Sequence, residues 1–504
     1  MKIPSDDLFL LIKSLSKSEK RYFKLYLDKG SPYLFVFDEI DKQKEYDERL
    51  LVQKIRKHIA SENIKNIKAH LLKIILKCLD QYSSETLFES GFKNQFKYIY
   101  ILQDKGLFDL CRKHIQKLKA ELKLYERYTD LVELSKVGRM FPGNSKEEVE
   151  QMYVTEKEAT EKIVAETSLR ALAHEIFKTI EVFQRARERK TIKKIEDFLN
   201  DPLLNENNIP GSFRAAYYYY DAICLCQHIL GHEEQAYLYR KSQVKLFEKN
   251  PQQTKQYPQS YILVLAHSLI ACFHTGRLSE AEKYLKELKA LQIKYNKAGN
   301  VRVATNLLWS ITNLEISMLS YSGNFNKIIL LISDLENKMK QEGQLGTGYK
   351  IDLSYSISYA YFGLGNYSQA LMWINKIINH PKIEIRSDIQ VHARILWMLI
   401  HYEMENYDFL ENSKRSVYRF LNKKGRLFKY ESIILDFIRK VYTIQDQKKK
   451  VQLFKMAKDQ LLVLKQDPLE KYAFEDFDII SWLDSKINER PFAELVREKS
   501  KTKF

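Results

Sequence analysis

Cysteine and histidine stand close together at one place in the sequence, CLCQHILGH (residues 224–232). Thiolates and imidazoles are the usual protein ligands of zinc, so Cys224, Cys226, His228 and His232 are the first candidates for a metal site. On a helix, however, residues 224 and 228 share a face, whereas residue 226 points away from it. No second cluster follows at ligand spacing. The sequence therefore favours buried thiols, and we expect neither a metal nor another cofactor.

Glycines gather in GQLGTGYK (residues 343–350), as they do in phosphate-binding loops. Such a loop needs a strand before it, a helix after it and a Lys-Ser or Lys-Thr pair, whereas here a helical pattern precedes it and Tyr349 comes before Lys350. A loop between helices is the better interpretation. Serine, histidine and aspartate also show no spacing typical of a catalytic triad, although the members of a triad need not be close in sequence. We expect no enzymatic activity.

Lysine and arginine give the chain a formal net charge of +17, and much of this charge is local. Residues 412–460 hold 14 Lys or Arg against four Asp or Glu. Lysines at the start of a helix oppose its dipole, so helix stability does not explain those near residue 448. Phosphate binding would explain them, and a solvated surface would also tolerate them. The candidates for anion binding are Lys423, Lys424, Arg426, Lys429, Lys448, Lys449 and Lys450.

Helices are the elements that must position these side chains. The 504 residues include only 16 glycines and 10 prolines, where average usage would give about 35 and 25. In KAHLLKIILKCLDQY (residues 68–82), apolar residues recur at the spacing of one helical face. No convincing β alternation bounded by turns occurs. The sequence predicts an all-α protein with long helices and few loops.

The cytoplasm is the compartment that the sequence favours. No run of about 18 apolar residues predicts a membrane span. The start of the chain has acidic residues before a short apolar run and lacks the cleavage site of a signal peptide. Five cysteines, a small and odd number, fit a reducing compartment.

One pattern recurs along the chain: an apolar helix, a short turn, an aromatic or apolar residue soon after, and a second amphipathic helix. The last five turns follow one another at 45, 47, 42 and 40 residues, and the 125-residue gap before them fits three units of similar length. A fixed period in this range predicts a stacked helical solenoid. The turns centre on Gly106, Gly231, Gly276, Gly323, Gly365 and Glu405.

Residues 351–381 resemble a tetratricopeptide repeat in four positions. The turn glycine, the aromatic residue after it, the small residue where the two helices cross and the terminating proline are Gly365, Tyr367, Ala370 and Pro381. A small side chain lets two helices approach closely, and proline ends the second helix.

Other units depart from this motif. Their crossing residues are Ala236 and Ala281 in two units, but Cys111, Ile328 and Leu410 in three others. All units are longer than the family's repeat and lack its signature tryptophan. The resemblance implies a superhelical α-solenoid of degenerate tetratricopeptide-like helix-turn-helix repeats.

The repeats set the expected domain boundaries. The solenoid covers residues 90–470, between an N-terminal helical module or cap (1–89) and a C-terminal helical cap with a basic tail (471–504). The N-terminal module is similar to the beginnings of tetratricopeptide-like proteins of unassigned role in Bacteroidetes-type bacteria, a resemblance that implies no activity.

A solenoid offers a concave groove lined by the first helices of its repeats. The resemblance implies that polar and aromatic side chains face this groove, and such side chains suit a peptide or an unpaired base. A tyrosine run at residues 217–220 supplies one of them. The groove candidates are Tyr218, Asp221, His228, His274, Asn313, Ser317, Tyr321, Tyr355, Tyr359, His392 and Tyr402.

Three functions are consistent with this surface. The first is a scaffold or adaptor that binds a protein or peptide segment in the groove, with binding that survives moderate salt. The second is an RNA- or ribosome-associated protein that uses the basic residues of 412–460, with binding that falls steeply as salt rises. The third is a sensor of a small peptide, which the peptide would stabilise against heat. The identity of the partner and the oligomeric state stay open.

Overall fold

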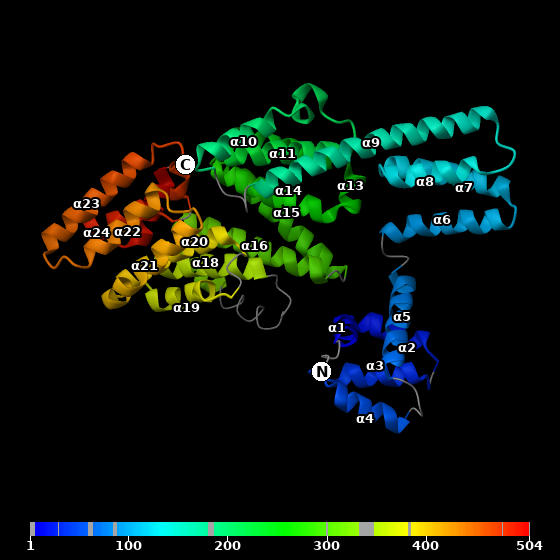
Figure 1. Cartoon of the computed structure of the whole chain (residues 1–504), viewed down its shortest axis with the longest axis horizontal. Helices are drawn as coiled ribbons and strands as arrows, with labels where there is room; N and C mark the ends of the chain where they lie inside the picture. Colours follow the sequence, from blue (N-terminus) through cyan, green and yellow to red (C-terminus); the bar gives the residue numbers. More distant parts are fainter. Residues whose placement is uncertain are drawn as a thin grey trace. The chain divides into compact units, whose positions relative to one another are not determined.

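The computed structural model describes residues 6–28, 30–58, 64–83, 88–179, 186–298, 301–331, 347–381, 385–475 and 477–502. Within these ranges the regular secondary structure is entirely helical, as the sequence predicts (Figure 1). The helices form two compact units, Met1–Ala159 and Thr160–Phe504. We describe each unit by itself.

The first unit contains two groups of helices, each around its own core. The first core lies between residues 8 and 78, within the predicted N-terminal module, and the second lies between residues 92 and 159. The helices of this unit are α1 (Asp7–Ser14), α2 (Lys17–Tyr26), α3 (Pro32–Lys42), α4 (Glu48–His58), α5 (Ile64–Ser83), α6 (Phe88–Asp104), α7 (Phe108–Leu124), α8 (Tyr128–Arg139) and the first part of α9 (Lys146–Thr179).

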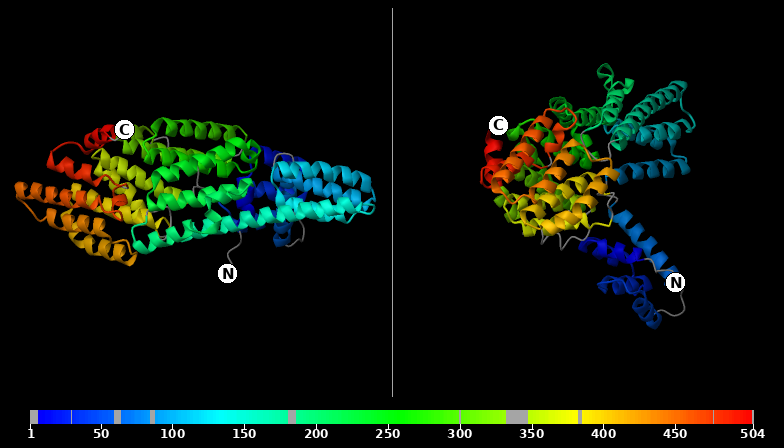
Figure 2. Two further views of the ribbon diagram at one scale, coloured as in Figure 1. Left: turned by 90° about the horizontal axis from the view of Figure 1, so that it is seen from above. Right: turned by 60° about the vertical axis from the view of Figure 1, so that its left-hand side comes forward.

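Three buried clusters follow one another along the second unit, and neighbouring clusters share a helix. Each helix packs mainly on the helices before and after it, an arrangement visible in Figure 2. The elements are α10 (Arg189–Leu199), η1 (Pro202–Leu204), η2 (Glu206–Asn208), α11 (Phe213–Leu230), α12 (Glu233–Lys249), α13 (Pro251–Gln256), α14 (Pro258–His274), α15 (Leu278–Lys297), α16 (Val301–Tyr321), α18 (Thr347–Gly363), α19 (Tyr367–Ile378), α20 (Ser387–Glu403), α21 (Tyr407–Lys423), α22 (Lys429–Val441), α23 (Gln447–Leu464), η3 (Lys471–Phe474), α24 (Ile479–Ile487) and α25 (Phe492–Thr502).

All six predicted turns are confirmed, and they share one geometry. The turn residue has a φ between 57° and 75°, and the next N–H donates to the carbonyl five residues earlier at 2.8–3.0 Å. This Schellman arrangement ends a helix by satisfying its last carbonyls. Glycine adopts the left-handed conformation without strain, and Glu405, with φ 57°, adopts it as well.

The predicted crossing residues lie in the core. Ala370 and Ala236 are each at most 2% exposed, on α19 and α12. Their backbones are so close to the preceding helix that Ser358 Oγ donates to the Ala370 carbonyl at 2.8 Å and Cys224 Sγ to the Ala236 carbonyl at 3.3 Å. Small residues therefore set the close approach of α18 to α19 and of α11 to α12, as predicted.

The expectation of three similar units between residues 106 and 231 is wrong. One helix, α9, runs for 34 residues in this interval, and two short 3₁₀ turns follow α10. The sequence of α9 contains neither glycine nor proline to break the helix.

The last elements of the second unit return to its beginning. Arg187, which precedes α10, pairs with Glu431 on α22 at 2.6 Å and with Glu470 at 2.5 Å. The three side chains are at most 11% exposed. Tyr472 Oη also reaches the carbonyl of Leu230 at 3.5 Å. We call Arg187, Glu431 and Glu470 the Arg187 cluster.

Candidate functional site

Two groove candidates, His228 of α11 and His274 of α14, lie close together. Arg214 donates to the Tyr218 hydroxyl, and the rings of His228 and His274 are 5.9 Å apart. His228 is partly buried, and its Nδ1 lies 3.5 Å from a carboxylate oxygen of Glu233. His274 is exposed. The predicted face of these two helices therefore combines two imidazoles with tyrosine and carboxylate groups.

Asp221 belongs to a polar network that sequence reasoning missed. Arg240 on α12 donates to Asp221 at 3.0 Å and to Gln243, and Gln243 donates to the Tyr217 carbonyl at 3.2 Å. Arg240 and Gln243 are buried, and their position on the apolar face of α12 was the available signal, since buried charges need partners. Burial, Arg240 and His228 lower the pKa of His267 to about 4.

The α16 candidates form a short polar row. Asn313 Oδ1 accepts from Ser356 of α18 at 3.1 Å, and the Asn313 carbonyl accepts from Ser317 at 2.9 Å. Tyr321 is partly buried, with its ring 4.6 Å from that of Phe273. Asn313 is partly buried and Ser317 is exposed. The row connects the faces of α14, α16 and α18.

The candidates on α18 and α20 are less open than those on α11–α16. Tyr355 and His392 are partly buried, whereas Tyr402 is a core residue at 7% exposure. The ring of Tyr359 lies 5.5 Å from that of Phe477, and the ring of Tyr402 lies 5.9 Å from that of Trp482.

Burial raises the pKa of both Tyr359 and Tyr402. The C-terminal elements cover these two positions, so a partner would have to displace them to reach either ring.

Those C-terminal elements also rest on the turns. A Cβ on Gly323 would lie 2.8 Å from the backbone nitrogen of Arg497, and a Cβ on Gly231 would lie 1.5 Å from the Tyr472 hydroxyl. Beside the Glu405 turn, Glu403 accepts from Trp482 Nε1 at 2.6 Å and pairs with Lys486 at 2.5 Å. The two glycines therefore serve both the turn geometry and a close approach.

The structure divides the anion-binding candidates into two groups. The first group surrounds the α21–α22 turn, where Lys429 Nζ lies 3.4 Å from Asp467, just after the end of α23. The second group starts α23, where Lys450 Nζ lies 6.0 Å from the ring of Tyr402 at the end of α20. Helix α22 separates the groups, because it packs antiparallel to α23. The first group is Lys423, Lys424, Arg426 and Lys429; the second is Lys448, Lys449 and Lys450.

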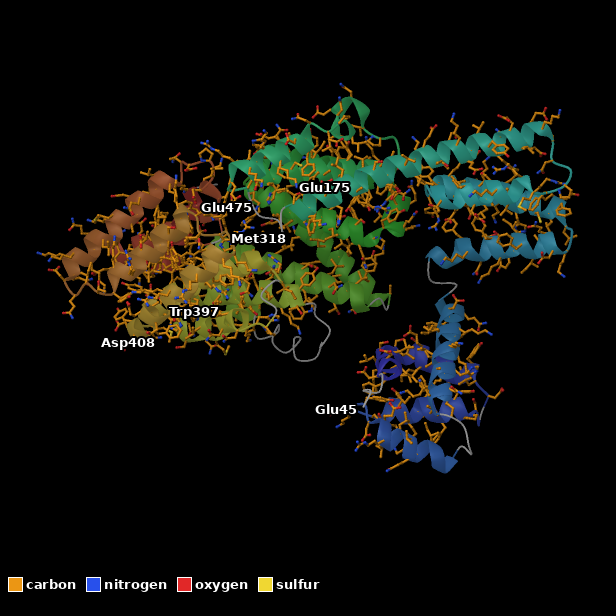
Figure 3. All side chains as sticks on the ribbon, viewed as in Figure 1. Glu45, Glu175, Met318, Trp397, Asp408 and Glu475 are labelled. Atoms are coloured by element: carbon orange, nitrogen blue, oxygen red, sulfur yellow. The ribbon has the colours of Figure 1, made fainter. Side chains whose placement is uncertain are left out.

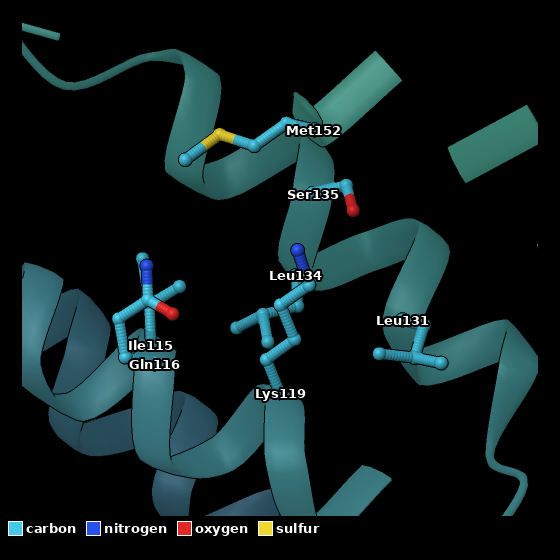
Figure 4. Close-up of a pocket in the computed structure, with 7 residues that line it drawn as sticks. All are labelled: Ile115, Gln116, Lys119, Leu131, Leu134, Ser135 and Met152. Atoms are coloured by element: carbon cyan, nitrogen blue, oxygen red, sulfur yellow. The ribbon is translucent and has the colours of Figure 1, made fainter. Parts of the chain in front are cut away.

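Two adjoining cavities lie in the first unit, between α7, α8 and α9. The smaller, of about 20 Å³, is lined by Ile115, Gln116, Lys119, Leu131, Leu134, Ser135 and Met152 (Figure 4). The larger, of about 410 Å³, shares four of these residues and adds polar groups that include Asn144 and Glu148. Burial and the neighbouring Lys123 lower the pKa of Lys119. Sequence reasoning gave no sign of these cavities, which three separate helices form.

All five cysteines are buried, and none of them forms a disulfide. In the part of the chain that the structure describes, no group of three His, Cys, Asp or Glu side chains is arranged to hold a metal ion. None of the described helices is long and apolar enough to cross a membrane. Part of the glycine-rich stretch, residues 343–346, lies outside the described residues, and residues 347–350 begin α18.

Comparisons with protein-family models, with curated proteins and with solved structures find no match to this chain. The likeness to tetratricopeptide repeats therefore rests on the six helix-turn-helix segments themselves, and the chain is assigned to no family.

Proposed function

We propose that the protein is a non-catalytic scaffold that binds a protein or peptide segment on the first helices of a degenerate tetratricopeptide-like solenoid. The observation that carries this proposal is the polar and aromatic surface shared by α11, α14 and α16. Its members include the exposed His274 and Ser317 and the partly buried His228. Imidazole, hydroxyl and carboxylate groups at this density suit the backbone and polar side chains of a peptide.

The six turns of one geometry support the solenoid part of the proposal. Among the described elements, five of these turns join two helices that pack on each other: α6–α7, α11–α12, α14–α15, α18–α19 and α20–α21. Successive cores of the second unit also share a helix. Stacked repeats of this kind present one continuous surface, because the first helices lie next to one another.

A capture experiment tests the scaffold proposal. Tagged protein is recovered from lysate of its native host at near-physiological salt, with and without RNase. The variant His274→Glu/Ser317→Arg changes two exposed positions on α14 and α16. Lys283→Glu on α15 is the control, because this exposed side chain belongs to a second helix.

We expect one protein partner that survives RNase, is retained by the control and is lost from the double variant. Retention of the same partner by the double variant would contradict the proposal. Recovery of only ribosomal or nucleic-acid partners that disappear with RNase would favour the second candidate.

That second candidate function is binding of RNA or ribosomes. The exposed Lys423 and Lys429 near the α21–α22 turn favour it. Nucleic-acid phosphates would pair with these two lysines and release counterions, so the affinity would be high at low salt and lower at high salt.

A further inference from the structure

A basic segment far from residues 412–460 in sequence lies beside the α21–α22 turn. Helix α10 begins RKTIKK (residues 189–194), which places four cations and no acidic residue in six positions. Arg189, Lys190, Lys193 and Lys194 are all exposed. Cations at the positive end of a helix oppose its dipole, so they do not stabilise α10.

The Arg187 cluster fixes the start of α10 next to the start of α22. Arg187 stands two residues before α10, and its partner Glu470 also accepts the backbone N–H of Lys429 at 3.0 Å. Arg187 packs 4.3 Å above the ring of Phe428.

Asp467 connects the same two segments. The backbone N–H of Leu469, the ammonium of Lys429 and the guanidinium of Arg189 hold the pKa of Asp467 below its usual value. The Asp467 carboxylate therefore interacts with a cation from α10, Arg189, and with one from α22, Lys429. These two residues are more than 230 positions apart in sequence. Glu188, which directly precedes α10, is an exposed acidic side chain in the same place.

The outer face of α21 extends this charge and adds an aromatic ring. Arg415, Arg419 and Lys423 recur every four residues, so they form one exposed row that ends at the turn. Tyr418 lies beside this row, three residues after Arg415, and is 51% exposed. Cations interleaved with an exposed ring suit a single strand, whose phosphates pair with the cations and whose bases stack on the ring.

We propose that residues 189–194 of α10, the outer face of α21 and residues 423–429 form one composite basic surface that binds single-stranded nucleic acid. The proposal rests on the second candidate function and gives it a location. It adds α10, which the sequence window did not contain, and it leaves out Lys448, Lys449 and Lys450 at the start of α23.

Three double charge reversals with the same change in net charge test the surface. Lys190→Glu/Lys193→Glu alters α10, and Arg419→Glu/Lys423→Glu alters α21. Lys448→Glu/Lys449→Glu is the matched control. It alters the start of α23, which lies at the opposite end of α22 from the α21–α22 turn. The probe is a fluorescein-labelled oligouridylate of about 20 nucleotides, followed by fluorescence anisotropy over about 50–200 mM salt. Circular dichroism and thermal melting of each variant show that the fold is retained.

We expect the α10 and α21 variants each to bind at least about tenfold more weakly than the unaltered protein at 100 mM salt. The slope of log affinity against log salt should fall by about 1.4, or 0.7 for each lost phosphate contact. The control should change affinity by less than about threefold. Tyr418→Ala should weaken binding by about fivefold or more, while Tyr418→Phe should not, because a base stacks on either ring.

Five outcomes would overturn the composite surface. If the α21 variant binds weakly but the α10 variant binds normally, the inference fails and the second candidate function survives. If the unaltered protein does not bind the probe, the inference fails, and the capture with and without RNase decides the second candidate function. Equal weakening by all three reversals would mean that net charge alone acts. Equal affinity for a duplex, or equal competition by polyglutamate, would exclude recognition of a single strand.

Discussion

At the scale of single residues, Gly323 and Gly365 separate two roles of a turn glycine. Both have a positive φ, of 66° and 73°. A Cβ on Gly323 would meet the backbone of α25, whereas a Cβ on Gly365 would have nothing within 4 Å. Comparison of the two positions therefore isolates the close approach of α25 from the geometry of the turn.

Gly365→Ala should lower the free energy of unfolding by about 1 kcal/mol, through left-handed strain alone. Gly323→Ala should lower it by about 1–3 kcal/mol more, because α25 must shift. Urea unfolding followed by tryptophan fluorescence measures both, since all four tryptophans lie between residues 309 and 482, in the second unit. Equal effects of the two substitutions would show that α25 is not held against the turn.

A second residue-scale prediction concerns pH. His401 is 6% exposed, with its ring stacked 4.0 Å from that of Phe409, and burial lowers its pKa to about 4. Above pH 6.5 the imidazole is neutral in both the folded and the unfolded chain, so it has no effect on stability. Between pH 6.5 and 4 the unfolded chain takes up the proton first, and folding loses up to about 3 kcal/mol.

His401→Gln should remove this loss. We expect the difference in unfolding free energy between the two proteins to change by about 2–3 kcal/mol from pH 7 to pH 4.5, as measured by urea titration. A difference that stays constant over this range would show that His401 is protonated as readily in the folded protein.

At the scale of helices, Ala370 sets the distance between α18 and α19. Ala370→Leu should destabilise the second unit by about 1–3 kcal/mol, because Ser358 already hydrogen-bonds the Ala370 carbonyl at 2.8 Å and leaves no room. Met372→Leu on the same helix is the control, since Met372 is 44% exposed and should change stability by less than about 0.5 kcal/mol. A neutral Ala370→Leu would mean that the pair of helices adjusts to the larger side chain.

The helices and their turns could be predicted from sequence because their signals are local. A glycine between two amphipathic stretches marked five of the six predicted turns in the sequence. Glu126 and Glu489 make the same turn, each with φ 52°, but have no glycine to mark them. Trp397 illustrates the same limit (Figure 3): its indole donates to Asn375 of α19 at 3.1 Å, a contact that depends on how two hairpins stack.

The candidate surfaces were predictable only in part. Tyr218 and His274 could be placed from their distance to a turn, whereas the network around Arg240 and the approach of α10 to α22 depend on tertiary packing. No spacing within one segment reports contacts between residues as far apart as 187 and 431.

At the scale of the second unit, the Arg187 cluster joins elements that the chain separates by 244 residues. Arg187→Met should lower the free energy of unfolding by about 3–5 kcal/mol, because two buried carboxylates lose the cation between them. The measurement is urea unfolding followed by tryptophan fluorescence. Arg490→Met is the control: its pair with Glu498 is exposed, so its loss should have a much smaller effect on the free energy of unfolding. Similar effects of the two substitutions would show that the cluster is not a buried connection.

Contact between the first and last elements also fixes how many hairpins the second unit can contain. An open stack tolerates gain or loss of a repeat, because each repeat touches only its neighbours. Here an added hairpin would carry Glu431 and Glu470 away from Arg187, and Tyr472 away from Leu230. Duplication or deletion of a single hairpin would leave these groups without their partners. We therefore expect relatives of this protein to differ by substitutions and by insertions in loops, at a constant number of hairpins.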